Sequence, residues 1–425
     1  MRRLVLHKIG FISVVLAAAS GCGASADDPA GQAGSGGAGT GGAATGGSGG
    51  GAGQAGAGGS AGTPAVCPDG HPMKRLAGKP VVDVMIGDQG PFAFVYDTGA
   101  PDTGIDPALA DKVGGGPYTV KLGGKQVELD SLITFPVQQY LNSKSVWGVI
   151  GANVMRNFAV TLDDSRSRFW LDDQRDESAL LACTHAKAAP AEVPYVEADY
   201  LFVPGKAEHK PGWFLVDTGA SLGAMPKSVF AELQAAHPRP ALDGFYTPAA
   251  VGTFWAQLTA VGALEVAGQK VEHIVTRTID DAMIPTPKLD APFLGVLPTG
   301  YLRHFLMTVD YPAGKLRLDG YADLPPREPD SFFALGIGFE QVTSPPIHVT
   351  QVLPGSSAAD EGIAIGDELV KVGGTDFASL TPYQRPWAMI DQSEHTAVPV
   401  TVLRAGKTIS ATLETRKLLT DPKLD

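Results

Sequence analysis

One tetrapeptide occurs twice in this chain, as Asp97–Ala100 and again as Asp217–Ala220, and both copies have the sequence Asp-Thr-Gly-Ala. Each copy follows an apolar run, Phe92–Tyr96 in the first case and Trp213–Val216 in the second. An apolar strand that ends in Asp-Thr-Gly places a carboxylate on a tight turn at the edge of a buried sheet. Two such turns that face each other would bring two carboxylates together, and paired carboxylates share a proton and can activate a water molecule.

Length and charge narrow the class of protein. The chain has 425 residues, of which 44% are hydrophobic, so it is long enough for several domains with cores of their own. Its formal net charge is −12. Because binding to phosphate backbones requires basic patches, we expect no nucleic acid among the partners of this chain.

Residues 1–22 have the pattern of an export signal, with a basic start followed by the apolar run Ile9–Ala19. This run is too short to span a bilayer. Residues Ala19–Cys22 resemble a bacterial lipobox, although that family usually has leucine in place of the alanine. The resemblance predicts lipidation at Cys22, a lipid anchor as the membrane contact, and export to the cell envelope, in the periplasm or at the cell surface. Ordinary cleavage after Ala17–Ala19 is the alternative.

Residues 23–70 form a stretch rich in Gly, Ala and Ser. No hydrophobic core can form from that composition, so we predict a disordered tether. About 44 residues of this kind have a root-mean-square reach of about 35–40 Å. Such a tether would hold a folded body away from a membrane surface.

Two further cysteines, Cys67 and Cys183, bracket the first Asp-Thr-Gly segment. In an exported protein this arrangement favours a disulfide between them. Two cysteines so far apart do not resemble a zinc site, and the histidines show no His-x-x-x-His spacing. We therefore predict no metal site.

The second half of the globular region repeats the order of the first. Val149–Gly151 is matched by Phe293–Gly295, and Phe158–Asp163 is matched by Phe305–Asp310. Both members of the second pair have the form Phe-x-x-Thr-apolar-Asp. Together with the doubled Asp-Thr-Gly, these landmarks predict two similar lobes. Both should be mostly β, because their apolar runs are short, β-branched and bounded by Gly and Pro.

The two predicted lobes, at residues 71–185 and 190–322, resemble the retropepsin-like and pepsin-like aspartic proteases. The resemblance implies a pair of β-barrels, and in this family a water held between two aspartates attacks the peptide bond without a metal or an organic cofactor. It implies that Asp97 and Asp217 are catalytic. The supporting residues would be Thr98 and Thr218, whose hydroxyls can hydrogen-bond across to the other lobe, and Gly99 and Gly219, which avoid a Cβ clash behind the carboxylates.

Alanine follows each glycine, at Ala100 and Ala220, as in retroviral members; pepsin-like members have Ser or Thr there. Without that extra donor the pKa values of the pair should be depressed less, which predicts a pH optimum of about 4.5–6.5. The family also needs a flap hairpin over the cleft. Tyr118–Leu129 and Phe245–Leu258 are both candidates, and the sequence does not distinguish them.

The third segment, residues 331–418, resembles a PDZ domain of the bacterial type. The resemblance rests on Leu335-Gly336-Ile337-Gly338-Phe339, which matches the carboxylate-binding loop, on Pro354–Ala358 and on Gly366–Leu369. It implies that peptide C-termini bind at Leu335, Gly336, Ile337, Gly338 and Phe339, where the peptide adds a strand to the sheet edge. A β-rich module that only packs on the lobes is the alternative.

The predicted fold is therefore mostly β, a two-lobed aspartic-protease-like pair of β-barrels followed by a PDZ domain. Two functions follow. The first is an exported aspartic endopeptidase that acts on peptide or protein substrates. The second is a catalytically inactive, protease-like lipoprotein that binds peptides. Aspartates close enough to share a water would favour the first, and a cleft filled by side chains would favour the second.

Overall fold

The computed structural model describes residues 70–141, 143–173, 191–197, 200–249, 252–283, 286–321, 332–382, 384–391 and 393–420. The predicted export signal with Cys22, the predicted tether and the predicted disulfide between Cys67 and Cys183 lie outside the described residues. The described part of the chain is mostly β, as predicted. We call strands β1–β10 with their helices lobe 1, strands β11–β21 with theirs lobe 2, and the elements from β22 onward the C-terminal domain.

Lobe 1 is built around two long strands, β2, which is buried over most of its length, and β3, which is buried at the end that leads to Asp97. Asp106 caps the first helix, because its side chain accepts a hydrogen bond from the N–H of Ala108, and a proline begins the helix. The elements are β1 (His71–Leu76), β2 (Lys79–Ile86), β3 (Gln89–Tyr96), β4 (Gly104–Ile105), α1 (Pro107–Val113), β5 (Tyr118–Leu122), β6 (Lys125–Leu129), β7 (Ile133–Thr134), α2 (Val137–Tyr140), β8 (Val146–Ile150), α3 (Ala152–Met155), β9 (Ala159–Asp163) and β10 (Arg168–Asp172).

Lobe 2 follows a similar order, but three of its strands and one of its helices are longer than any in lobe 1. The elements are β11 (Glu192–Pro194), β12 (Val196–Glu197), β13 (Leu201–Ala207), β14 (Lys210–Val216), β15 (Gly223–Pro226), α5 (Lys227–Ala236), β16 (Ala241–Ala249), β17 (Gly252–Val266), β18 (Gln269–Ile279), β19 (Phe293–Leu297), α6 (Thr299–Leu302), β20 (Leu306–Asp310) and β21 (Lys315–Asp319). One continuous cluster of buried apolar side chains includes residues of both lobes.

In each lobe, the strand that leads to Asp-Thr-Gly lies parallel to a strand from later in the sequence. Tyr96 of β3 is opposite Ile150 of β8, and Val216 of β14 is opposite Leu297 of β19. This register makes Ile150 equivalent to Leu297. Ile150 is followed by Gly151 in lobe 1, whereas Leu297 is followed by a proline in lobe 2.

The sequence-based match of Val149–Gly151 with Phe293–Gly295 is thus wrong by three positions. Gly295 is instead equivalent to Gly148, because these two glycines are opposite Phe214 and Phe94. The error arises because lobe 1 has two glycines three residues apart, so that an apolar-Gly pattern fits in two frames. A side chain is excluded at Gly148, since a Cβ there would lie 2.5 Å from Cδ1 of Phe94.

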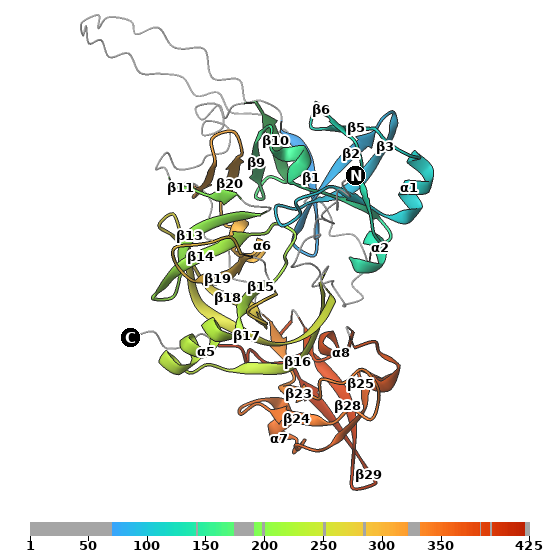
Figure 1. The fold of residues 1–425 in the computed structure, drawn as a ribbon. Coiled ribbons are helices and arrows are strands. Elements are labelled where there is room, and N and C mark those ends of the chain that lie inside the picture. Colours follow the sequence, from blue (N-terminus) through green and yellow to red (C-terminus); the bar gives the residue numbers. More distant parts are fainter. Residues whose placement is uncertain are drawn as a thin grey trace, which may run out of the picture. The chain divides into compact units, whose positions relative to one another are not determined.

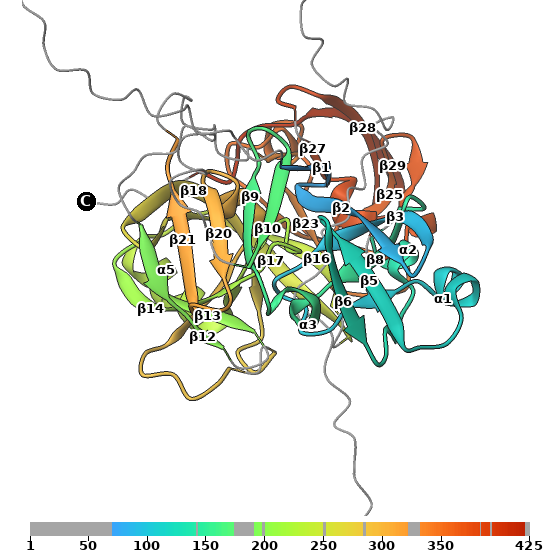
Figure 2. The same cartoon turned by 90° about the horizontal axis from the view of Figure 1, so that it is seen from above.

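The two lobes are joined by a sheet to which both contribute. Figures 1 and 2 show β9 of lobe 1 beside β20 of lobe 2, and the two strands pair antiparallel with Thr161 opposite Thr308. The hydroxyl groups of these two threonines lie 2.9 Å apart and are buried. They occupy the same position of the repeated Phe-x-x-Thr-apolar-Asp landmark, so the pairing relates the two lobes symmetrically.

The two lobes differ in their hairpins. In lobe 1 the end of β5 next to its turn pairs with β2, as the end of β17 next to its turn pairs with β13 in lobe 2. Lobe 2 has in addition the strand β16, which pairs with the first part of β17. Of the two predicted flap candidates, Phe245–Leu258 therefore lies in the long hairpin β16–β17, whereas Tyr118–Leu129 is a short hairpin at the edge of β2.

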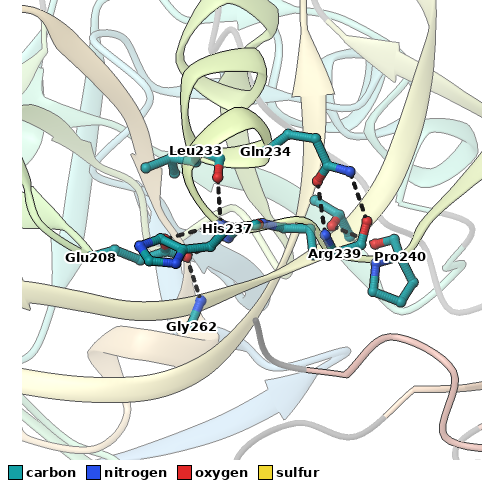
Figure 3. A network of polar contacts seen from close by, with 8 residues as sticks. Glu208, Leu233, Gln234, His237, Arg239, Pro240 and Gly262 are labelled. Atoms are coloured by element: carbon teal, nitrogen blue, oxygen red, sulfur yellow. Dashed lines mark hydrogen bonds and ion pairs between the residues drawn. The ribbon is translucent and has the colours of Figure 1, made fainter. Parts of the chain in front are cut away.

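A buried ion pair fixes the turn between β13 and β14 in lobe 2. Both carboxylate oxygens of Glu208 contact the guanidinium of Arg239, and neither side chain is more than 1% exposed. Arg239 also donates to the carbonyl oxygens of Leu233 and His237, and the N–H of Gly262 donates to Glu208 (Figure 3). The pair therefore ties the end of α5 and strand β17 to this turn.

The C-terminal domain is a small β domain with its own apolar core, which includes Leu335, Ile337 and Phe339. Asp367 accepts two hydrogen bonds from the guanidinium of Arg404, at 2.6 and 2.7 Å, which fixes the turn before β25. The elements are β22 (Phe333–Ala334), β23 (Ile337–Phe339), β24 (Val349–Val352), α7 (Ser357–Asp360), β25 (Glu368–Val372), β26 (Thr375–Asp376), the 3₁₀ helix η1 (Phe377–Ser379), α8 (Gln384–Trp387), β27 (Ile390–Asp391), β28 (Ala397–Arg404) and β29 (Lys407–Glu414).

Candidate active site

The two Asp-Thr-Gly turns lie at equivalent places in the two lobes. Each aspartate follows directly on a buried strand, Asp97 on β3 and Asp217 on β14. The N–H of Asp97 donates to the carbonyl oxygen of Ile150 at 3.0 Å, and that of Asp217 donates to Leu297 at 3.2 Å. These hydrogen bonds to the parallel strands β8 and β19 therefore fix the position of each aspartate at the end of its own strand.

Thr98 and Thr218 bind the two turns to each other. The hydroxyl of Thr98 donates to the carbonyl oxygen of Val216, and the hydroxyl of Thr218 donates to that of Tyr96, both at 2.8 Å. Each hydroxyl also accepts from the N–H of the other threonine, at 3.0 and 3.1 Å. Four buried hydrogen bonds thus cross between the lobes, in the arrangement that the sequence predicts for these threonines.

Gly99 and Gly219 allow the two carboxylates to approach. The N–H of each glycine donates to Oδ1 of the aspartate in its own turn at 2.8 Å. A Cβ on Gly99 would lie 2.6 Å from Cγ of Asp217, and a Cβ on Gly219 would lie 2.5 Å from Cγ of Asp97. The glycines are therefore required because each faces the carboxylate of the opposite lobe, and this steric reason is more specific than a tight turn alone.

The two carboxyl groups form one buried unit. Asp97 is 0% exposed and Asp217 is 1% exposed. Burial raises the pKa of Asp217 well above its usual range, and Asp97 raises it further by its charge and by a side-chain hydrogen bond. The hydrogen bonds from Gly219 and Ala220 act in the opposite direction. Asp217 is therefore expected to keep its proton at pH values where an exposed aspartate has lost it.

A buried lysine lies near this pair, and the sequence gives no sign of it. Lys79 is 1% exposed, and its Nζ donates to Oγ of Ser221 at 2.6 Å. Burial lowers the pKa of Lys79 to about 8, the charge of Arg277 lowers it further, and the charges of Asp217 and Asp97 act in the opposite direction. Lys79 begins strand β2, where a charged residue is ordinarily exposed, and its partner Ser221 belongs to lobe 2.

The predicted peptide-binding residues of the C-terminal domain lie at one turn and one short strand. The side chains of Leu335, Ile337 and Phe339 are buried in the core of the domain. Gly336 has a φ of +86°, and a Cβ there would lie 2.5 Å from Oγ of Ser356, so glycine is required at this position. The N–H of Leu335 donates to the carbonyl oxygen of Met389, so this N–H is already paired within the domain.

Within the described ranges, no three His, Cys, Asp or Glu side chains are grouped as metal ligands would be. No helix among the described elements is both long enough and apolar enough to cross a membrane.

Comparison with protein families identifies the last domain. Residues 327–403 match the family model of the PDZ domain. The C-terminal domain is a PDZ domain. A search of curated proteins found no match for this chain.

Among solved structures, one similar chain is the photosystem II D1 C-terminal processing protease, which is 21% identical over the aligned part. The match covers 20% of this chain and 24% of that chain, with a TM-score of 0.19. This chain thus matches about a quarter of the length of that protease. A likeness of this size does not bear on the function of the two lobes.

Proposed function

We propose that this chain is an exported aspartic-type endopeptidase, with Asp97 and Asp217 as a catalytic pair within one chain and a PDZ domain that binds peptide C-termini. The observation that supports it best is the buried pair itself. Two buried carboxyl groups lie on equivalent turns, and each faces the glycine of the other turn. Such a pair shares a proton and can activate water.

In the proposed reaction the pair acts as a unit. The ionised carboxylate takes a proton from a water molecule as the water oxygen attacks the carbonyl carbon of the peptide bond. The protonated carboxyl donates a hydrogen bond to the carbonyl oxygen. A proton then passes to the amide nitrogen, and the C–N bond breaks. We assign neither role to Asp97 or Asp217 alone, because coupled groups titrate together.

Two observations favour the second candidate, a protease-like protein that binds peptides without cutting them. Neither aspartate has more than 1% of its surface exposed, so a substrate reaches the pair only after neighbouring segments move. The buried Lys79 beside Ser221 also occupies space near the pair. A chain that never opens at this place would bind peptides at the PDZ domain alone.

The test is to incubate the full-length chain with a mixed peptide library from about pH 3 to about pH 8, the range in which carboxyl pairs titrate. Products are identified by mass spectrometry, with Asp97→Asn and Asp217→Asn as controls. Cleavage that both substitutions abolish supports the endopeptidase. Peptide binding without cleavage at any pH supports the second candidate. The proposals of export and of lipidation at Cys22 are tested separately, by metabolic labelling with a fatty acid in intact cells.

A further inference from the structure

The long hairpin of lobe 2 contacts the PDZ domain. Figure 1 shows β16 beside β23 and close to α8. The side-chain amide of Gln351, on β24, binds the backbone of β16 at two points. Its Oε1 accepts from the N–H of Asp243 at 3.1 Å, and its Nε2 donates to the carbonyl oxygen of Ala241 at 2.8 Å. The amide therefore satisfies one donor and one acceptor of β16, as a neighbouring strand would.

Apolar contacts extend the same surface on β16. The main chain of Gly244 approaches Phe339 so closely that a Cβ there would lie 3.0 Å from the aromatic ring. The ring of Phe245 meets that of Trp387 edge to face, with centroids 6.2 Å apart. Phe245 is buried in one cluster with Leu353 of the PDZ domain. The hairpin is thus packed on the PDZ domain and not only hydrogen-bonded to it.

The hairpin contacts β23, the strand to which a bound peptide C-terminus would be expected to pair. Among the described strands, β23 pairs only with β24, so its second edge has no strand partner. A peptide C-terminus that adds a strand to a PDZ domain lies along such an edge, beside the glycine-containing loop. Gly338 and Phe339 of that strand already contact the hairpin, at Asp243 and Gly244.

We propose that hairpin β16–β17 and a peptide C-terminus compete for strand β23, so that a bound peptide releases the hairpin from the PDZ domain. The bulge of β16 between Leu242 and Phe245 supports this view, because Gly244, with a φ of +95°, adapts the strand locally to Phe339. In this structure β16 thus packs against β23 and β24 through Gly244 and Gln351, without pairing with β23 as a strand.

The link from the hairpin to Asp97 and Asp217 bears on the proposed peptidase function. Strand β17 carries Phe254, whose ring centre lies 5.9 Å from the guanidinium carbon of Arg277. Arg277 in turn acts on Lys79 through its charge, and Lys79 is bound to Ser221, four residues after Asp217. The hairpin thus reaches the surroundings of the buried pair.

The first test measures the competition without using activity. A library of peptides with random C-terminal residues and a free carboxylate is screened against the full-length chain, and the tightest binder is the probe. We expect amide hydrogen exchange of residues 241–246 to rise when this peptide binds. The same peptide with an amidated C-terminus is the control and should leave exchange unchanged. Binding of the probe with unchanged exchange in residues 241–246 would overturn the proposal.

The second test weakens the hairpin contact. Gln351→Ala removes both hydrogen bonds to β16, so a larger fraction of molecules has β23 free, and the apparent affinity for the probe should rise about tenfold. Thr350→Ala, an exposed neighbour on the same strand, is the matched control and should not change the affinity. Equal affinity of the wild type and Gln351→Ala, or no binding by either, would contradict the proposal.

The two proposals fail in different ways. If exchange and affinity change as expected but no peptide is cleaved, the competition stands and the peptidase is rejected. If peptides are cleaved but exchange in residues 241–246 and the affinity of Gln351→Ala do not change, the peptidase stands and the competition is rejected.

Discussion

Lobe 1 and lobe 2 hold Asp97 and Asp217 by the same hydrogen bonds, yet they differ in almost everything around these turns. In lobe 1 the turn between β2 and β3 carries Asp88, which is exposed and pairs with Lys121 at the surface. At the equivalent turn of lobe 2, Glu208 is buried with Arg239. Lobe 2 alone has the long hairpin on the PDZ domain. Symmetry is thus retained where the carboxylates meet and lost where each lobe has its own contacts.

The largest effect on stability is expected where the lobes differ most. Glu208→Gln leaves the charge of Arg239 buried without its counterpart, and we expect a loss of about 3–5 kcal/mol in the free energy of unfolding. Asp88→Asn in lobe 1 is the matched control, with an expected loss below about 1 kcal/mol because its ion pair is exposed. Chemical denaturation of both variants measures the difference. Equal losses would show that the two turns are not distinguished by burial.

The next largest effect is expected on substitution of the two glycines, and it should be the same in both lobes. Gly99→Ala and Gly219→Ala each place a methyl group against the opposite carboxylate, and each should cost about 1–3 kcal/mol of stability. Because the methyl group would push the two aspartates apart, the rate of peptide cleavage should fall by about 100-fold. Gly115→Ala, where a Cβ meets no atom within 4 Å, is the control. A fully active Gly219→Ala variant would refute the close approach of the two carboxylates.

A smaller symmetrical effect is expected at the threonines. Thr98→Val and Thr218→Val each remove one hydroxyl that makes two buried hydrogen bonds between the lobes. Each should cost about 1–2 kcal/mol, and the two losses should agree within about 0.5 kcal/mol. Thermal unfolding of both variants beside Thr98→Ser, which keeps the hydroxyl, provides the measurement. Losses of stability that differ several-fold between the two variants would show that the hydrogen bonds between the lobes are not equivalent.

The smallest effect is a pH dependence of stability. Because the pKa of Asp217 is raised on folding, the stability that depends on its proton is fully present below its ordinary value of 3.8 and is lost as pH rises through the raised value. Asp217→Asn removes this loss, so its Tm should exceed that of the wild type by about 2–4 °C at neutral pH, with no such excess near pH 3. A constant difference at all pH values would mean that Asp217 does not titrate with a raised pKa.

The sequence allows the local chemistry to be predicted because short motifs fix it. Asp-Thr-Gly after an apolar strand defines a turn, and its repetition predicts that two turns face each other. The landmark Phe158–Asp163 pairs with its counterpart Phe305–Asp310 through the two threonines, which a repeat search can find. The PDZ domain is likewise predicted from its glycine pattern and is confirmed by the family match.

What could not be predicted depends on contacts between distant segments. The burial of Lys79 depends on Ser221, which is 142 residues away. The contact between Gln351 and β16 joins residues 108 and 110 positions apart. Nothing in the local composition near these residues indicates such partners. The sequence also does not fix the frame of Gly151, since only the register of β8 and β19 distinguishes it from Gly148.

The central claim is that Asp97 and Asp217 act as one unit in one chain. Its most direct test compares the cleavage rate of one identified peptide by Asp97→Asn, by Asp217→Asn and by the double variant. The account predicts that each single substitution lowers the rate about 10²- to 10⁴-fold and that the double substitution lowers it no further. A single variant that retains wild-type activity, or losses that multiply in the double variant, would contradict it.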